Sequence, residues 1–216
     1  TACTGHGPAR YWLHTNMLTF NGKKMAKSEG TGVTPREMLT GDHPLLTQAY
    51  SAMTIRFFML QAHYRSTLDF SNEALQAAEK GLKRLMVALN SLEDLAVSET
   101  STLDVSDMHE KLYAAMNDDF NSPIAIAHLF EAVKWINLIA DGKETISASD
   151  KEAFTKLLND FVVEVLGLKN ESNNDGADKI DGLVQFALEL RQQAKLDKIF
   201  DSNSSNVVRF LFGHNR

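Results

Sequence analysis

Cysteine is almost absent from this sequence, since Cys3 is the only one among 216 residues. A lone cysteine forms no disulfide within the chain and no metal site by itself. We therefore expect a reducing, cytoplasmic setting. Long hydrophobic runs are also lacking, and no stretch approaches the span of a membrane helix. The start at Thr1 shows no targeting peptide, and the missing Met suggests a fragment or a processed chain.

An excess of positive charge is lacking as well. The chain has 22 Lys and Arg against 28 Asp and Glu, a net charge of −6. Nonspecific nucleic-acid binding depends on neutralising phosphates with basic side chains, so this balance argues mildly against such binding but leaves room for a local basic face. With 44% hydrophobic and 23% charged residues, the composition is that of a globular chain of one or two domains. We expect no membrane partner and no DNA partner.

Helical periodicity dominates beyond Pro35. Thr34 followed by Pro35 and Glu37 predicts a capping box at the start of a short helix. A longer helix with a leucine stripe is expected after the N-cap Ser71. We predict a polar linker over 169–178. The longer helices are predicted over 45–62, 71–95, 106–116, 122–140, 147–166 or 149–166, and 179–195. Ser106 is expected to open the helix over 106–116, and Gly167 is expected to stop the helix that ends at residue 166.

The segment before Pro35 has the pattern of a hairpin. Residues 17–20 are strand-like, and Asn21-Gly22 is a typical type I′ turn before a short return strand at 23–25. The loop that follows reads KMAKS, from Lys24 to Ser28. Lys24 and Lys27 can approach phosphates from one side, and the Ser28 hydroxyl can donate to a phosphate oxygen. From these five residues alone, an exposed lysine loop without a ligand is the alternative interpretation.

Three motifs in order resemble one family. The stretch Lys24–Ser28 resembles the KMSKS loop of class I aminoacyl-tRNA synthetases, and Tyr11–His14 with the hairpin resembles its approach in cysteinyl-tRNA synthetases. Residues 53–70 resemble that family's segment ending in an AHYRS-type sequence. Residues 113–123 (YAAMNDDFNSP) resemble its "aMdDDfNtP" motif at the helical DALR domain. The resemblance covers roughly residues 1–195.

This resemblance implies a mainly α fold. Residues 1–40 would be a remnant of the α/β class I catalytic domain with its KMSKS-type loop. Residues 41–100 would be a helical linking, stem-contact-like region, and 101–197 a DALR-type helical bundle. Residues 198–216 read as an irregular tail that departs from the family, which indicates a frameshift or truncation and leaves anticodon recognition open.

The resemblance also implies a function. A cysteine–tRNA ligase uses ATP with Mg to form cysteinyl-adenylate and then moves the cysteinyl group to its tRNA. Lys27 would contact ATP, with Lys24 and Ser28 at the flanking loop positions. The family's zinc ligands and His-Ile-Gly-His element belong to an N-terminal catalytic half that has no counterpart here, so we expect the isolated chain to be inactive. Glu29 and Thr31 stand where the family usually has leucine and asparagine.

Two rival functions remain open, a cysteine ligase of the mycothiol pathway and a non-catalytic helical module that binds tRNA or another partner. Several residue groups also have two interpretations. The segment 63–65 (HYR) is a tRNA contact or a cationic helix end. The pair 118–119 (DD) is a metal pair or, as we favour, a polar break that ties two helices together. The basic residues Lys80, Lys83 and Arg84 meet phosphate or only solvent. We expect Phe130 and Trp135 to pack in or near the core, and His109 and His128 to bind no metal.

Overall fold

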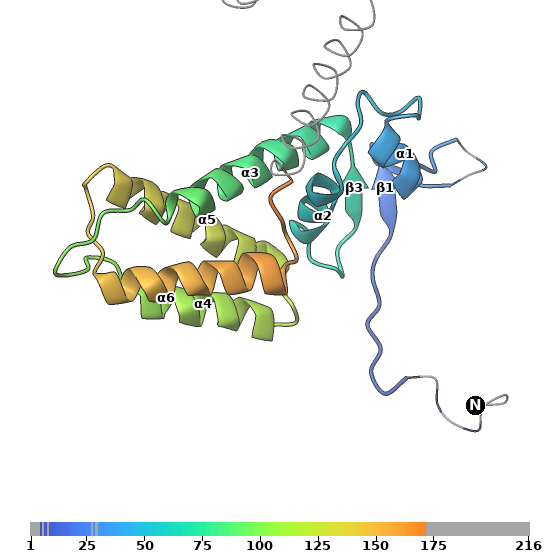
Figure 1. Ribbon diagram of the computed structural model, residues 1–216. Helices are drawn as coiled ribbons and strands as arrows, with labels where there is room; N and C mark the ends of the chain where they lie inside the picture. Colours follow the sequence, from blue (N-terminus) through green and yellow to red (C-terminus); the bar gives the residue numbers. More distant parts are fainter. Residues whose placement is uncertain (1–4, 6, 8, 27, 29, 172–216) are drawn as a thin grey trace, which may run out of the picture. The chain divides into compact units, whose positions relative to one another are not determined.

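The computed structural model describes residues 5, 7, 9–26, 28 and 30–171 (Figure 1). Cys3, Lys27 and Glu29 lie outside the described residues, as do the helix predicted over 179–195 and the tail from residue 198. The described chain forms a small three-stranded sheet, one short helix and a helical region whose last element ends at Val165, all within one compact unit that ends at Lys169. The expectation of a mainly helical protein is confirmed.

The sheet has the strand order β2-β1-β3. Strand β1 (Leu18–Phe20) pairs with β2 (Lys23–Lys24) in antiparallel and with β3 (Leu68–Phe70) in parallel orientation. Asn21 and Gly22 have φ angles of 50° and 73°, the left-handed values that a type I′ turn requires. The predicted hairpin is therefore confirmed, whereas β3, which joins its partner from 50 residues away, was not predicted.

Helix α1 (Pro35–Thr40) begins as its sequence predicts. The Thr34 hydroxyl accepts a hydrogen bond from the Glu37 amide, and the Glu37 carboxylate accepts one from the Thr34 amide at 2.7 Å. Gly41 ends the helix with a φ of 77°. A Cβ at this position would lie 2.8 Å from the Ala49 nitrogen, so only glycine fits the close approach of residues 41 and 49.

Helix α2 (Ala52–Leu60) is shorter than predicted, because residues 45–50 form a loop. The Asn72 side chain holds this loop: its Nδ2 donates to the Leu45 carbonyl at 2.7 Å, and its Oδ1 accepts from the Thr47 amide at 3.0 Å. The buried Tyr50 hydroxyl donates to the same Oδ1 at 3.0 Å. The expected start of a helix near residue 45 is wrong because a distant side chain binds the backbone there, and Ser51 supplies the true N-cap.

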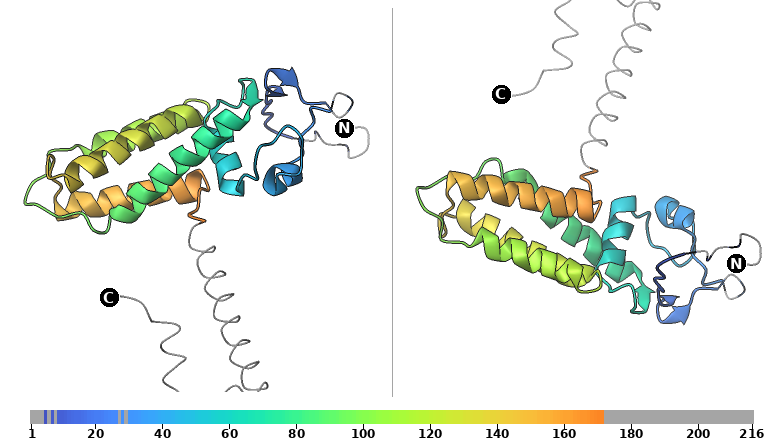
Figure 2. Two further views of the ribbon diagram at one scale, coloured as in Figure 1. Left: turned by 90° about the horizontal axis from the view of Figure 1, so that it is seen from above. Right: turned by 90° about the horizontal axis from the view of Figure 1, so that it is seen from below.

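Four further helices form a bundle (Figures 1 and 2): α3 (Asn72–Ser91), α4 (Val105–Asn117), α5 (Ser122–Ala140) and α6 (Ala148–Asn159). Helix α5 packs against α3 and α4, and α6 packs against both of these. The predicted caps Ser71 and Ser147 are confirmed. The helix predicted over 122–140 is confirmed as α5, whereas the predicted start of α4 is wrong, because Asp104 caps this helix in place of Ser106.

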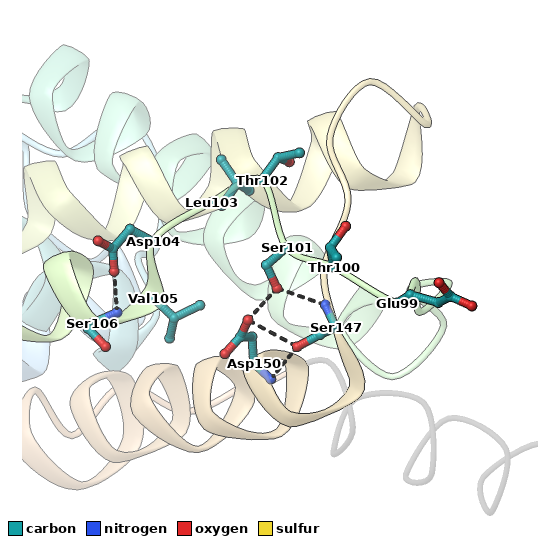
Figure 3. Close-up of a pocket in the computed structure, with 10 residues that line it drawn as sticks. All are labelled: Glu99, Thr100, Ser101, Thr102, Leu103, Asp104, Val105, Ser106, Ser147 and Asp150. Atoms are coloured by element: carbon teal, nitrogen blue, oxygen red, sulfur yellow. Dashed lines mark hydrogen bonds between the residues drawn. The ribbon is translucent and has the colours of Figure 1, made fainter.

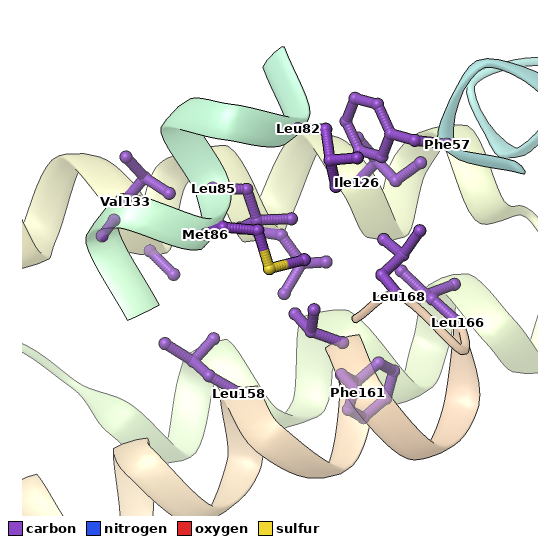
Figure 4. Packing of buried hydrophobic residues seen from close by; sticks show 14 of the residues in the cluster. Phe57, Leu82, Leu85, Met86, Ile126, Val133, Leu158, Phe161, Leu166 and Leu168 are labelled. Carbon is purple, nitrogen blue, oxygen red and sulfur yellow. The ribbon is translucent and has the colours of Figure 1, made fainter. Parts of the chain in front are cut away.

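The buried faces of the helices pack against one another in one hydrophobic core (Figure 4). The predicted stripe of α3 is buried at Leu75, Ala78, Leu82, Leu85 and Leu92. Phe130 and Trp135 pack against this core as expected, and the Trp135 ring lies 5.9 Å from that of Phe154. Burial of these apolar surfaces is the main force that holds the bundle together.

Helix α5 corrects one expectation from the sequence. Its 19 residues, with a mean hydropathy of 1.3, are long and apolar enough to cross a membrane by length and composition. In the described structure its apolar side chains, such as Ile126, Leu129 and Ile136, are buried in the core of the bundle. Neighbouring helices cover it on more than one side, which accounts for its apolar composition without a membrane.

The last helix of the bundle continues into a π-helix (Asp160–Val165), which no sequence pattern predicted. The Arg56 side chain of α2 donates from Nε to the Leu166 carbonyl at 2.7 Å. Gly167 follows with a φ of 64°, and a Cβ there would lie 2.5 Å from the Arg56 guanidinium. Gly167 thus stops the helix as predicted and also makes room for Arg56.

Candidate functional site

The hairpin that carries the lysine loop is fixed by one carboxylate of β3. The Asp69 Oδ1 accepts from the Thr19 hydroxyl at 2.6 Å and from the Gly22 amide at 2.8 Å. Charge-assisted hydrogen bonds of this kind are shorter and stronger than neutral ones. Because Asp69 binds both β1 and the turn that follows it, β3 fixes the hairpin whose second strand carries Lys24.

The base of the loop is closed by Thr31. Its hydroxyl donates to the Lys24 carbonyl at 2.7 Å and accepts from the Ala26 amide at 3.2 Å. The Thr31 amide also donates to the Ala26 carbonyl at 3.3 Å. Residues 24 and 31 are therefore tied together while Lys24 and Ser28 are exposed to solvent. Sequence reasoning treated Thr31 only as a departure from the family and missed this contact.

A second cluster joins two of the sequence motifs. The Tyr64 hydroxyl donates to Asp119 Oδ1 at 2.7 Å, and the Arg65 Nε lies 2.9 Å from Asp119 Oδ2. His63 Nε2 lies 3.8 Å from the same carboxylate. The hydrogen bond with Tyr64, followed by the charge of Asp119, raises the pKa of the Arg65 guanidinium. The segment after α2 and the turn between α4 and α5 are thus bound to each other.

The turn that presents Asp119 has an unusual backbone. Asp119 and Phe120 both have a φ of 54°, in the left-handed region that side chains with a Cβ avoid. Phe120 is 58% exposed. The polar break predicted at 118–119 is confirmed, since α4 ends at Asn117 and α5 begins at Ser122. Among the described residues no group of three or more potential metal ligands occurs.

One hollow of the described structure lies between the α3–α4 connection and the start of α6 (Figure 3). Its volume is about 500 Å³. Asp150 accepts hydrogen bonds from the Ser101 and Ser147 hydroxyls, and these bonds, that of Ser101 first, lower the pKa of Asp150. Because these polar groups bind one another and no histidine, lysine or cysteine lines the hollow, we interpret it as structural.

A smaller hollow of about 440 Å³ lies between α3 and α5. Lys80, Lys83 and Arg84, the basic residues noted in the sequence, line one part of it together. The guanidinium of Arg84 lies 5.8 Å from the centre of the Phe130 ring. The structure therefore gathers these three cations in one groove.

Comparisons with known proteins match two parts of this chain to family models and nearly all of it to curated relatives. Residues 1–80 match the family described as the tRNA synthetases class I (C) catalytic domain, and residues 111–170 match the DALR domain. A cysteine–tRNA ligase of Parabacteroides distasonis is 52% identical over 210 residues, which cover 96% of this chain and 42% of that protein. One of Phocaeicola vulgatus is 53% identical over 212 residues (96% and 43%), and one of Cytophaga hutchinsonii is 45% identical over 204 residues (90% and 40%).

The chain spans about two-fifths of the length of these curated relatives. A match over 96% of this chain extends into residues 198–216, where we expected the sequence to depart from the family. The catalytic-domain match precedes the DALR match along the chain, which is the order that the motifs predicted. On this similarity, the chain belongs to the cysteine–tRNA ligase family.

Proposed function

We propose that this chain contributes the lysine loop and a helical, tRNA-facing region to an ATP-dependent cysteine–tRNA ligase. In this proposal residues 1–40 end the catalytic domain and 41–100 link it to the bundle of 101–197. One observation carries the proposal. In a chain that is 52% identical to a cysteine–tRNA ligase, the exposed Lys24 lies on a hairpin whose turn is bound by Asp69 and whose following loop is bound by Thr31.

The reaction has two steps. The cysteine carboxylate attacks the α-phosphate of ATP, which forms cysteinyl-adenylate and releases pyrophosphate. A hydroxyl of the terminal ribose of tRNA then attacks the adenylate carbonyl and releases AMP. Negative charge grows on the phosphate oxygens in the first step, and Lys24, Lys27 and Ser28 are the groups of this chain that would stabilise it.

The tether of the loop supports this assignment. Lys24 and Ser28 are exposed, so both fit a role at the phosphate oxygens of an incoming nucleotide with its Mg. Thr31 and Asp69 limit the motion of the residues that precede and follow the loop. A lysine that the fold already holds in position needs less rearrangement when negative charge develops on the phosphate oxygens than a freely moving lysine does. The described residues offer no zinc site, and we assign no step of this chain to zinc.

The N-terminal stretch supports association with more protein. Tyr11, Trp12 and Leu13 are 85%, 65% and 60% exposed. Adjacent large apolar side chains in solvent are typical of a surface that another protein segment covers. We propose that the remainder of the catalytic domain covers them and supplies the cysteine site, and that this chain is inactive without it.

The test uses the chain combined with the N-terminal half of a relative. Lys27→Ala is expected to slow cysteine-dependent ATP–pyrophosphate exchange by roughly 100-fold, a typical loss for one charge-stabilising group, without changing the unfolding curve. Lys23→Ala is the matched control, because it removes an exposed lysine of the same hairpin outside the motif. Equal exchange rates in both variants would refute the role of Lys27. Cysteine transfer to an amino sugar in place of tRNA would support the mycothiol alternative.

A further inference from the structure

The polar cluster of Tyr64, Arg65 and Asp119 is connected to the lysine hairpin through backbone contacts. Tyr64 and Arg65 bind the Asp119 carboxylate with their side chains, at 2.7 and 2.9 Å. The backbone of the same two residues binds Asn16, which lies two positions before β1. The Asn16 amide donates to the Tyr64 carbonyl at 3.2 Å, and its Nδ2 donates to the Arg65 carbonyl at 2.8 Å. Residues 64 and 65 therefore contact the bundle with their side chains and the start of the hairpin with their backbone.

A second connection runs through β3. This strand begins three residues after Arg65 and pairs with β1 in parallel orientation. Its Asp69 accepts hydrogen bonds from the Thr19 hydroxyl and the Gly22 amide. Lys24 follows on β2, which is paired with β1. The segment that Asp119 binds is thus connected to the lysine hairpin both before β1 and along β3.

Stability alone is a weak reason for this cluster. The side chains of Arg65 and Asp119 are 66% and 41% exposed, and exposed ion pairs contribute little to the free energy of unfolding. The turn that presents the carboxylate nevertheless holds both Asp119 and Phe120 at a φ of 54°. Backbone strain of this kind is concentrated at places where the position of a group matters to function. The groups that Asp119 positions are Tyr64 and Arg65, and through them the hairpin.

We propose that Asp119 is a positioning residue for adenylate formation. It fixes the segment of Tyr64 and Arg65, and this segment in turn fixes the direction of Lys24 toward the phosphate oxygens. The inference rests on the proposed function, since it requires that the lysine loop stabilises the charge of the first step. Asp119 acts in this way without touching ATP or tRNA. Because a charge-stabilising group is effective only in a narrow range of geometry, a small shift of the hairpin weakens its effect.

The test measures cysteine-dependent ATP–pyrophosphate exchange in the chain combined with the N-terminal half of a relative. Asp119→Ala is expected to slow exchange by roughly 3- to 30-fold. Tyr64→Phe, which keeps the ring and removes one hydrogen bond to Asp119, is expected to slow it by a smaller factor. Asp141→Ala is the matched control, because it removes an exposed ion pair with Lys143 at the other end of α5, and it is expected to leave the rate unchanged. Unfolding curves define a temperature at which every variant is folded.

A double-substitution cycle with Lys24→Ala separates positioning from a general loss of structure. If Asp119 acts through Lys24, Asp119→Ala slows exchange much less in the Lys24→Ala enzyme than in the unsubstituted one. A loss of folded enzyme lowers the rate by the same factor in both, so the two losses multiply. Multiplying losses would overturn the inference, and so would equal rates of the Asp119→Ala and Asp141→Ala enzymes.

The inference and the proposed function fail in different ways. No exchange from the unsubstituted combined enzyme would refute the proposed function. Normal exchange that Lys24→Ala slows, with multiplying losses in the cycle, would refute only the positioning by Asp119. Normal exchange that Lys24→Ala leaves unchanged would refute the role of Lys24 and, with it, this inference.

Discussion

The hydroxyl of Tyr64 donates a hydrogen bond to Asp119 at 2.7 Å, across 55 residues of sequence. This contact joins the AHYRS-type segment after α2 to the turn between α4 and α5. Arg65 adds a second link, because its Nε donates to the Tyr64 hydroxyl at 3.0 Å and lies 2.9 Å from the Asp119 carboxylate. Two motifs that the sequence shows far apart are therefore parts of one polar cluster.

Removing the Tyr64 hydroxyl tests this cluster. Tyr64→Phe deletes both hydrogen bonds of the hydroxyl and leaves the ring in place, so it is expected to lower the free energy of unfolding by about 1 kcal/mol. Urea denaturation monitored by circular dichroism measures the change. Tyr11→Phe, at a hydroxyl on a side chain that is 85% exposed, is the control and is expected to change nothing. Equal stability of the two variants would show that the cluster does not hold the turn.

The left-handed turn makes a second prediction. Phe120→Gly removes a Cβ at a φ of 54°, which relieves roughly 1–2 kcal/mol of strain against an entropy cost of about 0.5–1 kcal/mol. We expect stability to stay equal or to rise by up to about 1.5 kcal/mol. Ile124→Gly, at an exposed position inside α5, is expected to cost about 1 kcal/mol by the same urea measurement. If Phe120→Gly lowers the free energy of unfolding as much as Ile124→Gly does, the backbone at Phe120 is not strained.

Gly167 and Gly22 provide a matched pair. Both have a positive φ, but a Cβ at Gly167 would lie 2.5 Å from the Arg56 guanidinium, whereas nothing lies within 4 Å of one at Gly22. Gly22→Ala is expected to cost about 1–2 kcal/mol from backbone strain alone. Gly167→Ala should cost at least about 1 kcal/mol more, because Arg56 must leave its hydrogen bond with Leu166. Thermal or urea unfolding that gives equal losses would show that Arg56 does not hold this end of the bundle.

Asp150 predicts a pH dependence. Its pKa is lowered from the ordinary value of 3.8 by hydrogen bonds from Ser101 and then Ser147. A lowered native pKa means that the stabilisation is complete above the unfolded pKa and is lost as the pH falls through the native one. Between about pH 5 and pH 2 the unfolding free energy of Asp150→Asn should therefore fall less steeply than that of the unsubstituted chain. Asp94→Asn, an exposed carboxylate outside this network, is the control, and identical slopes for Asp150→Asn and the parent would refute the prediction.

Local sequence signals predicted the elements that depend on local contacts. The Asn21-Gly22 turn, the capping box of Thr34 and Glu37, and the N-cap Ser71 each involve residues within a few positions of one another. These signals carry their own geometry, so the sequence alone is sufficient to find them.

Features that depend on distant residues were missed. Strand β3 is only three residues long and forms by pairing with β1, and the loop over residues 45–50 is held by Asn72. The bond between Arg56 and Leu166 spans 110 residues. No local pattern contains these partners, because each exists only after the chain has folded. The resemblance to synthetases named Lys24 and Ser28, but only the structure brought Thr31 to the base of their loop.

The most direct test of the central claim is cysteine-dependent ATP–pyrophosphate exchange. It is measured on this chain alone and on the chain mixed with the N-terminal half of a related cysteine–tRNA ligase. Our account predicts no exchange from the chain alone and clear exchange from the mixture, which Lys27→Ala reduces. No exchange in a mixture in which both parts are folded and associated would contradict the account, and the chain would then be a helical binding module without a role in adenylate formation.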